Sequence, residues 1–113
     1  MSMQAKLIAH LADVLDVPVA SEVPESRPAR MVCLSRTGGG RTRFVETPRF
    51  TVDAWGTSDL DAADLLDAAC DALVWAPGSI DELVHVGVSS SYRSDVDGAH
   101  RWSATIEVLA NLI

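Results

Sequence analysis

The sequence has only two cysteines, Cys33 and Cys70, and no apolar run long enough to span a bilayer. The cysteines show no short spacing motif and lie in apolar runs, so we expect reduced core thiols of a cytoplasmic protein. Acidic residues interrupt every hydrophobic stretch well below the ~18 residues that a transmembrane helix requires. The first segment contains Asp13 and Asp16 in place of the apolar core of a signal peptide. These absences argue against a disulfide-rich secreted domain and against a membrane-spanning protein.

The sequence also lacks the usual motifs of nucleotide, metal and nucleophilic sites. The glycine-rich segment 37–41 has no lysine and precedes no predicted helix, so it does not match a phosphate-binding loop. The three histidines form no i, i+4 pair, and the cysteines form no CxxC motif. The serines at 89–91 lie outside any Gly-x-Ser-x-Gly elbow. We therefore predict no enzyme activity, no cofactor and no metal site.

Charge is unevenly distributed along the chain, whose net charge is −7. This acidic balance argues against a general nucleic-acid binder. Residues 24–49 carry six arginines and two glutamates, whereas residues 50–92 carry eight acidic residues and no lysine or arginine. The split is compatible with an ordinary solvated surface, and equally with a subunit whose basic face meets the acidic face of an identical neighbour. Such opposed potentials orient an encounter, and head-to-tail contacts close into rings.

Two amphipathic helices are predicted. Apolar residues at intervals of three and four predict a helix over 3–16, which Pro18 prevents from continuing. A second helix follows Thr57 or Ser58, either of which supplies an N-cap, and ends at the Pro-Gly pair 77–78. One stripe of this helix is apolar, and the opposite stripe is acidic, formed by Asp61, Asp64, Asp67 and Asp71.

Alternation of apolar and polar residues predicts the strands. These segments are 30–36, 49–55, 84–88 and 101–110, with a short edge strand within 17–23. Pro48 is expected to limit the strand that follows it. Residues 37–43 are expected to be a flexible basic connection, and residues 89–98 a polar loop. The three tryptophans are assigned to the core or to a subunit interface, namely Trp55, Trp75 and Trp102.

The predicted element order is α-β-β-β-α-β-β, in a single domain over residues 1–113. It indicates an α+β fold with a mixed or antiparallel sheet of four to five strands flanked by two helices. The two helices are expected to pack on one face of the sheet.

Several segments in this order also resemble a known family. They are Val-Pro-Glu-Ser-Arg-Pro-Ala-Arg-Met-Val at 23–32, the Arg-Thr-Gly-Gly-Gly-Arg turn at 36–41, and Pro-Arg-Phe-Thr-Val-Asp-Ala-Trp at 48–55, followed by an Ala/Asp/Leu-rich helix. The combination resembles the small tail terminator (tail completion) proteins of long-tailed phages and prophages of actinobacteria. The resemblance runs from about residue 2 to residue 110 and is most specific from Val23 to about Leu73.

The resemblance implies a structural virion protein without enzymatic activity. Members of this family form a six-membered ring that caps the tail tube, ends its polymerisation and offers the surface on which the filled head docks. The implied partners are a second copy of the chain, the major tail tube protein and a head–tail connector or stopper protein. DNA would pass through the ring without sequence-specific binding. The implied location is the tail–neck junction of the virion, after assembly in the host cytoplasm.

Other functions are compatible with the same residues. A head-completion or stopper protein of the neck would share the composition and the lack of catalytic motifs. A small ligand-binding or enzymatic α+β domain would need a pocket with converging polar groups, and a cytoplasmic adaptor unrelated to phages is a third alternative.

The charge split suggests where the subunits of a ring would touch. Basic residues of one subunit would face the acidic helix of its neighbour, and the 89–98 loop would contact the tube or the connector. The basic residues are Arg36, Arg41, Arg43 and Arg49, the acidic ones are Asp61, Asp64, Asp67 and Asp71, and the loop contributes Tyr92 and Arg93.

Overall fold

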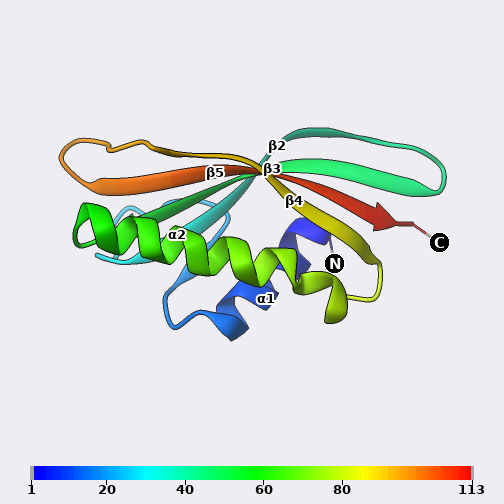
Figure 1. The fold of residues 1–113 in the computed structure, drawn as a ribbon, viewed down its shortest axis with the longest axis horizontal. Coiled ribbons are helices and arrows are strands. Elements are labelled where there is room, and N and C mark those ends of the chain that lie inside the picture. The colour runs from blue at the N-terminus through cyan, green and yellow to red at the C-terminus, as the bar shows by residue number, and fades with distance from the viewer. Residues whose placement is uncertain (1, 113) are drawn as a thin grey trace.

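Two helices lie on one face of a twisted five-stranded sheet in the computed structural model, which describes residues 2–112 (Figure 1). In chain order the elements are α1 (Met3–Val14), β1 (Val19–Ala20), β2 (Met31–Arg41), β3 (Val45–Gly56), α2 (Asp59–Val74), the short 3-10 helix η1 (Ala76–Gly78), β4 (Leu83–Arg93) and β5 (His100–Asn111). This order confirms the predicted α+β fold. No helix within the described residues is long and apolar enough to cross a membrane.

The strands lie side by side in the order β1-β2-β3-β5-β4. β1 pairs with β2 in parallel, and every other neighbouring pair is antiparallel. The β2–β3 hairpin and the β4–β5 hairpin extend in opposite directions from the centre of the molecule (Figure 1). We call the side covered by the helices the helix face, and the other side the open face.

Local signals explain where the helices begin. The Ser2 hydroxyl accepts a hydrogen bond from the Ala5 backbone N–H at 3.1 Å, and the Ser58 hydroxyl accepts one from the Asp61 N–H at 3.1 Å. Each serine thereby satisfies an amide that the first helical turn leaves without a partner. Of the two expected caps of α2, Ser58 is the one used. α1 ends at Val14, two residues before the predicted end at Asp16.

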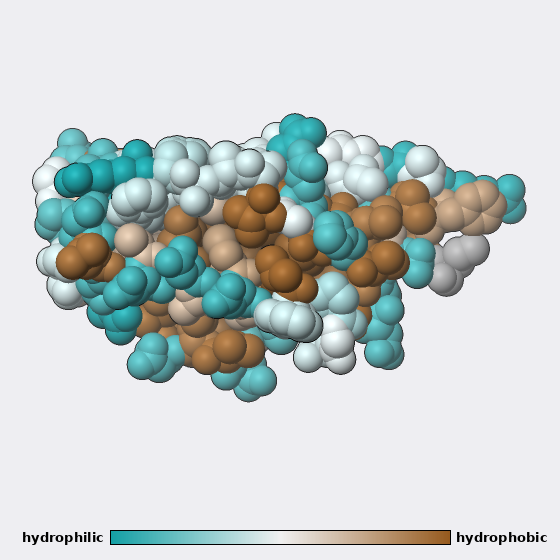
Figure 2. All heavy atoms as spheres, viewed as in Figure 1, coloured by the Kyte–Doolittle hydropathy of each residue, from teal (hydrophilic) through white to brown (hydrophobic). Residues whose placement is uncertain are grey.

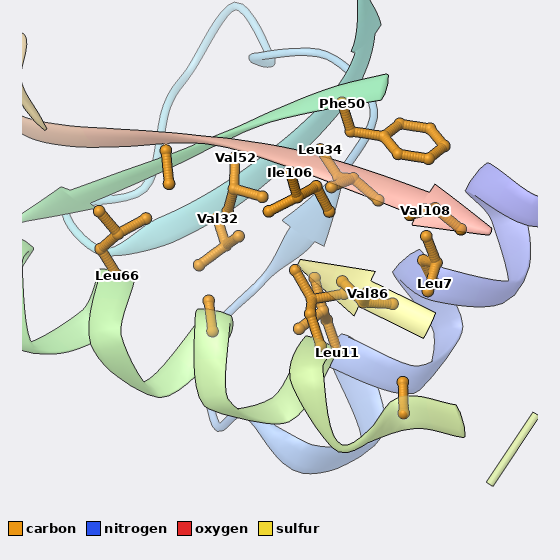
Figure 3. Close-up of a cluster of buried hydrophobic side chains, with 14 of the residues drawn as sticks. Leu7, Leu11, Val32, Leu34, Phe50, Val52, Leu66, Val86, Ile106 and Val108 are labelled. Carbon is orange, nitrogen blue, oxygen red and sulfur yellow. The ribbon is translucent and has the colours of Figure 1, made fainter. Parts of the chain in front are cut away.

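The main core fills the space between the helix face and the two helices (Figure 3). Leu7 and Leu11 of α1 and Leu66 of α2 lie between the helices and the sheet (Figure 3). The alternation predicted for β3 is confirmed, because Phe50, Val52 and Ala54 are fully buried in this core. On the open face, Met31, Cys33 and Trp55 form a second, smaller cluster.

The prediction that Pro48 limits β3 is wrong. β3 begins at Val45 and carries Pro48 as a buried residue opposite Gly39. On its other side the pairing with β5 passes from Glu46 directly to Arg49. The missing N–H of the proline therefore falls in a gap of that ladder, where it costs no regular hydrogen bond.

Two expected loops are also shorter than predicted. β2 continues through the glycines to Arg41, so the 37–43 connection is mostly strand. β4 continues to Arg93, because Ser90 to Arg93 pair with β5. The tip that remains contains Asp97 (φ 48°) and Gly98 (φ 81°) between the bridged pair Val96 and Ala99. This Asp-Gly pair is typical of a tight hairpin turn.

Candidate subunit interface

The four arginines of the predicted basic surface all lie on the β2–β3 hairpin, but they do not share one face. Arg36 pairs with Phe50 and Arg41 with Glu46, which places both on the helix face. Arg49 lies opposite Gly38 and Glu107, on the open face. Arg43 lies in the turn between the strands.

A bulge brings Arg36 and Arg41 to the same side. The register of β2 against β3 shifts between Arg36 and Gly38. In a regular strand, residues five positions apart point to opposite faces. The extra residue at Thr37 reverses that parity, so both guanidinium groups line one cleft with Lys6 of α1.

Arg41 and Arg43 carry the free positive charge of the hairpin. Arg36 lies 3.9 Å from the Glu46 carboxylate, and Arg49 lies 3.8 Å from Glu107. Within the part of the chain that the structure describes, no carboxylate lies within ion-pair distance of Arg41 or Arg43. The Arg43 guanidinium instead lies 5.5 Å from the ring centre of Phe44, which is 53% exposed. A partner would therefore meet a cationic tip with an apolar ring.

The predicted acidic stripe divides into one structural residue and three free ones. Asp61 accepts hydrogen bonds from the Thr57 backbone N–H at 2.8 Å and from Arg30 Nε at 3.1 Å. The Thr57 N–H, followed by Arg30, holds the pKa of the Asp61 carboxyl below its ordinary value. Asp61 therefore fastens the start of α2 and is not available to a partner.

The other three carboxylates of the predicted stripe form the acidic helix surface, consisting of Asp64, Asp67 and Asp71. All three are exposed, and none has an ion-pair partner among residues 2–112. Trp75, directly after α2, is 79% exposed. A core role for Trp75 is therefore wrong, while Trp55 is buried in the second cluster as expected.

Charge on α2 also affects the thiol of the same helix. Burial, and after it the negative charges of Asp67 and Asp71, raises the pKa of Cys70 to about 11. Cys33 on β2 has a raised pKa for the same first reason. Both cysteines are free thiols; Cys33 is buried, and Cys70 is half-buried.

Arg93 is occupied within its own chain. It lies 2.7 Å from Asp95 and 3.2 Å from Asp59 at the start of α2. Its hydrogen bond to Asp95, followed by the charge of Asp59, raises the pKa of the guanidinium further. Trp102 Nε1 donates to the same Asp59 carboxylate at 2.9 Å. Arg93 therefore fastens the β4–β5 hairpin to α2, whereas the neighbouring Tyr92 is 46% exposed on the open face.

Sequence reasoning missed the cleft beneath the β2–β3 hairpin, because its residues come from distant parts of the chain. The cleft has a volume of about 430 Å³ and carries both signs of charge. Lys6 on its wall forms an ion pair with Glu82, and Gln4 Nε2 donates to the Leu34 carbonyl at 2.9 Å. These contacts hold α1 against the sheet. No local pattern signals them.

A side-chain network lies on the open face, where the Ser103 hydroxyl donates to the Asp53 carboxylate and lies 2.6 Å from the Ser94 hydroxyl. His10 lies 3.1 Å from the Ala72 carbonyl, and the Ser89 hydroxyl donates to the Thr105 carbonyl at 3.2 Å. Among residues 2–112, no three His, Cys, Asp or Glu side chains are grouped to hold a metal ion. On the face shown in Figure 2, hydrophobic residues lie between hydrophilic ones over the helices, and few hydrophobic residues lie along the upper rim.

The fold defines a small α+β domain that has a known structural counterpart. No family model matches the sequence, and no curated protein matches it. Among solved structures, the chain is similar to one in the virion of a native gene transfer agent (GTA) particle, with a TM-score of 0.67 and 16% sequence identity. The match covers 97% of this chain and 95% of the other. At this identity the similarity establishes the shared fold.

Proposed function

We propose that this chain is a non-enzymatic structural protein of a virion, and specifically a tail terminator. Six copies would form a ring that caps the tail tube, ends its polymerisation and presents the surface on which the head docks. The observation that carries this proposal is the fold similarity to a chain of a gene transfer agent virion over 97% of the sequence. The match covers almost the whole of both chains, so the comparison concerns the overall fold and not a local motif.

The free charges support a head-to-tail contact between copies. Arg41 and Arg43 lie on a hairpin that extends away from the body of the molecule (Figure 1). The acidic helix surface has no partner in its own described chain. A contact between two different patches is heterologous, and it closes into a ring when the rotation between neighbours permits. We place the hairpin of each copy against the acidic helix surface of the next.

A terminator must also bind the end of the tube without recreating it. We assign the β4–β5 hairpin, with exposed Tyr92, to the contact with the tube protein or with the head–tail connector. DNA would pass through the ring without sequence-specific contacts, in keeping with the net charge of −7. The site of action would be the tail–neck junction, reached after assembly in the host cytoplasm.

The decisive experiment is electron microscopy of particles produced without this gene, with a plasmid copy as the matched control. A terminator is expected to leave overlong, headless tubes beside DNA-filled heads, and the plasmid copy should restore normal particles. Tails of normal length detached from heads would instead assign the chain to the head-side stopper class. Unaltered infectious particles would refute a virion function.

A further inference from the structure

The sheet has two edges with no neighbouring strand among residues 2–112. β4 is the last strand of the sheet and pairs only with β5. At the other side, β1 pairs only with Val32 and Cys33 of β2. Residues 34–41 of β2 therefore pair with β3 on one side and lie beside no described strand on the other, although the Leu34 carbonyl accepts a hydrogen bond from Gln4 of α1. A free strand edge presents backbone N–H and C=O groups that pair readily with another strand.

The β4 edge has two bulges but lacks the other residues that protect natural edges. From Leu83 to Tyr92 it contains no lysine, arginine or proline. Val84 is 46% exposed and Val88 is 39% exposed. Two bulges, before His85 and after Val88, leave the stretch 85–88 in regular register. This short stretch is open to a further strand.

The free part of β2 contains three consecutive glycines, at 38–40, which have no side chains. Gly39 is required by its own hairpin, because its φ is +107° and an added Cβ would lie 2.3 Å from the Thr47 carbonyl oxygen. Gly38 and Gly40 face no such restriction, since their nearest contacts would be side-chain atoms at 3.4 and 3.6 Å. Glycine within a strand permits the close approach of another backbone. The intramolecular fold leaves the glycines at 38 and 40 unexplained.

We propose that β4 of one copy pairs with the free part of β2 in the next copy, so that the ring contains one continuous sheet. This inference rests on the proposed ring and specifies its contact. Strand directions alternate across β2, β3, β5 and β4. Copies related by rotation about an axis along the strands would therefore place β4 antiparallel to the neighbouring β2.

The two edges also match in level and in charge. Successive strand pairings join Gly38 of β2, through Arg49 and Glu107, to Gly87 of β4. The free part of β2 therefore lies at the same height in the sheet as the first half of β4. Exposed Asp81 lies just before β4, at the same end of the sheet as Arg41, which has no ion pair among residues 2–112.

The same pairing agrees with the proposed charge contact. α2 packs beneath β4. A neighbour's Arg41, on the helix face of the adjoining β2, would therefore come beside this helix. Backbone pairing and charge attraction then act at one contact between the same two copies.

Hydrogen exchange of the full-length protein tests the pairing without any substitution. Exchange is measured by mass spectrometry below and above the concentration at which the chain assembles, alone and with tail tubes. Peptides covering 34–41 and 83–88 should exchange at least about tenfold more slowly in the assembled state, because outward-facing amides become hydrogen-bonded. Rings in which these peptides exchange as fast as in the monomer would overturn the pairing and leave the proposed ring intact. A chain that stays monomeric even with tubes would overturn both.

Lysines placed on the edge provide a second test. Val84→Lys/Val88→Lys should weaken assembly by about tenfold or more, since edge lysines oppose strand addition. Val14→Lys is a surface control, because Val14 is 55% exposed and lies on α1 and not on β4. Circular dichroism verifies that both variants are folded. Wild-type assembly of the folded double variant would contradict the pairing, and if that variant does not fold, the exchange measurement decides.

Discussion

Reversal of the two free arginines of the β2–β3 hairpin tests the proposed charge contact most directly. Arg41→Glu/Arg43→Glu should weaken ring formation and leave the isolated subunit folded. Neither arginine forms an ion pair within the described chain, but Arg41→Glu would lie directly opposite Glu46, so the free energy of unfolding should fall by no more than about 1 kcal/mol. Any effect on assembly then originates between subunits.

The expected size of the effect follows from the exposure of these groups. One exposed ion pair contributes about 0.2–1 kcal/mol. Reversal replaces two attractions with two repulsions, so each contact should lose about 1–4 kcal/mol. Since each 1.4 kcal/mol corresponds to a factor of ten, association should weaken by roughly fivefold to several hundredfold.

Sedimentation velocity at two salt concentrations measures both the loss and its cause. The Debye length, over which charges interact, falls from about 10 Å at 0.1 M to about 3 Å at 1 M ionic strength. Wild-type assembly should therefore weaken with salt, and assembly of the variant should not. Adding Asp67→Arg and Asp71→Arg to the same chain restores opposite charges across a head-to-tail contact. This fourfold variant should regain much of the lost assembly. Wild-type rings in the double variant, or no recovery in the fourfold one, would refute this placement of the contact.

Three further predictions concern the isolated fold. Gly56→Ala should lower the free energy of unfolding, measured in urea, by about 1–3 kcal/mol, because the added Cβ would lie 2.4 Å from the Ala62 nitrogen. Gly78→Ala is the control, because its added Cβ would have no atom within 4 Å. Equal stabilities of the two variants would contradict the close packing at Gly56. Because the pKa of Asp61 is lowered from 3.8, the contribution of this carboxylate to the free energy of unfolding should be complete above pH 3.8 and decline as pH falls through the lowered pKa. The difference in unfolding free energy between wild type and Asp61→Asn should therefore narrow at low pH. A difference that does not change with pH would show that Asp61 does not stabilise the start of α2 as an anion. Since burial raises the pKa of Cys70 to about 11, iodoacetamide at pH 8 should modify this thiol far more slowly than in urea, and equal rates would show that it is accessible.

The helices were predictable because their signals are local. α2 has its N-cap at Ser58, acidic residues in its first turn and apolar residues at helical spacing. Each of these signals acts within a few residues of the chain. The alternation of β3 is equally local, so the face that carries Phe50 and Val52 could be assigned to the core.

Strand ends depended on partners that are distant in the sequence. Polar residues from Ser89 onwards give no local strand signal, yet β5 extends β4 to Arg93 by pairing with it. Pro48 normally ends a strand, but here it falls in a gap of the β3–β5 pairing. Backbone hydrogen bonds across a sheet do not depend on the polarity of the side chains, and for that reason residue patterns misplace these ends.

For the candidate interface, the sequence alone determined the inventory of charge: a block rich in arginine followed by a block with only acidic residues. The tertiary structure decided which of these charges are free. Asp61 is bonded to Thr57 and Arg30. Arg93 forms ion pairs with Asp59 and Asp95. A single bulge placed Arg36 and Arg41 on one face. Ion pairing and strand parity depend on which groups meet in space, and only the folded chain brings these groups together.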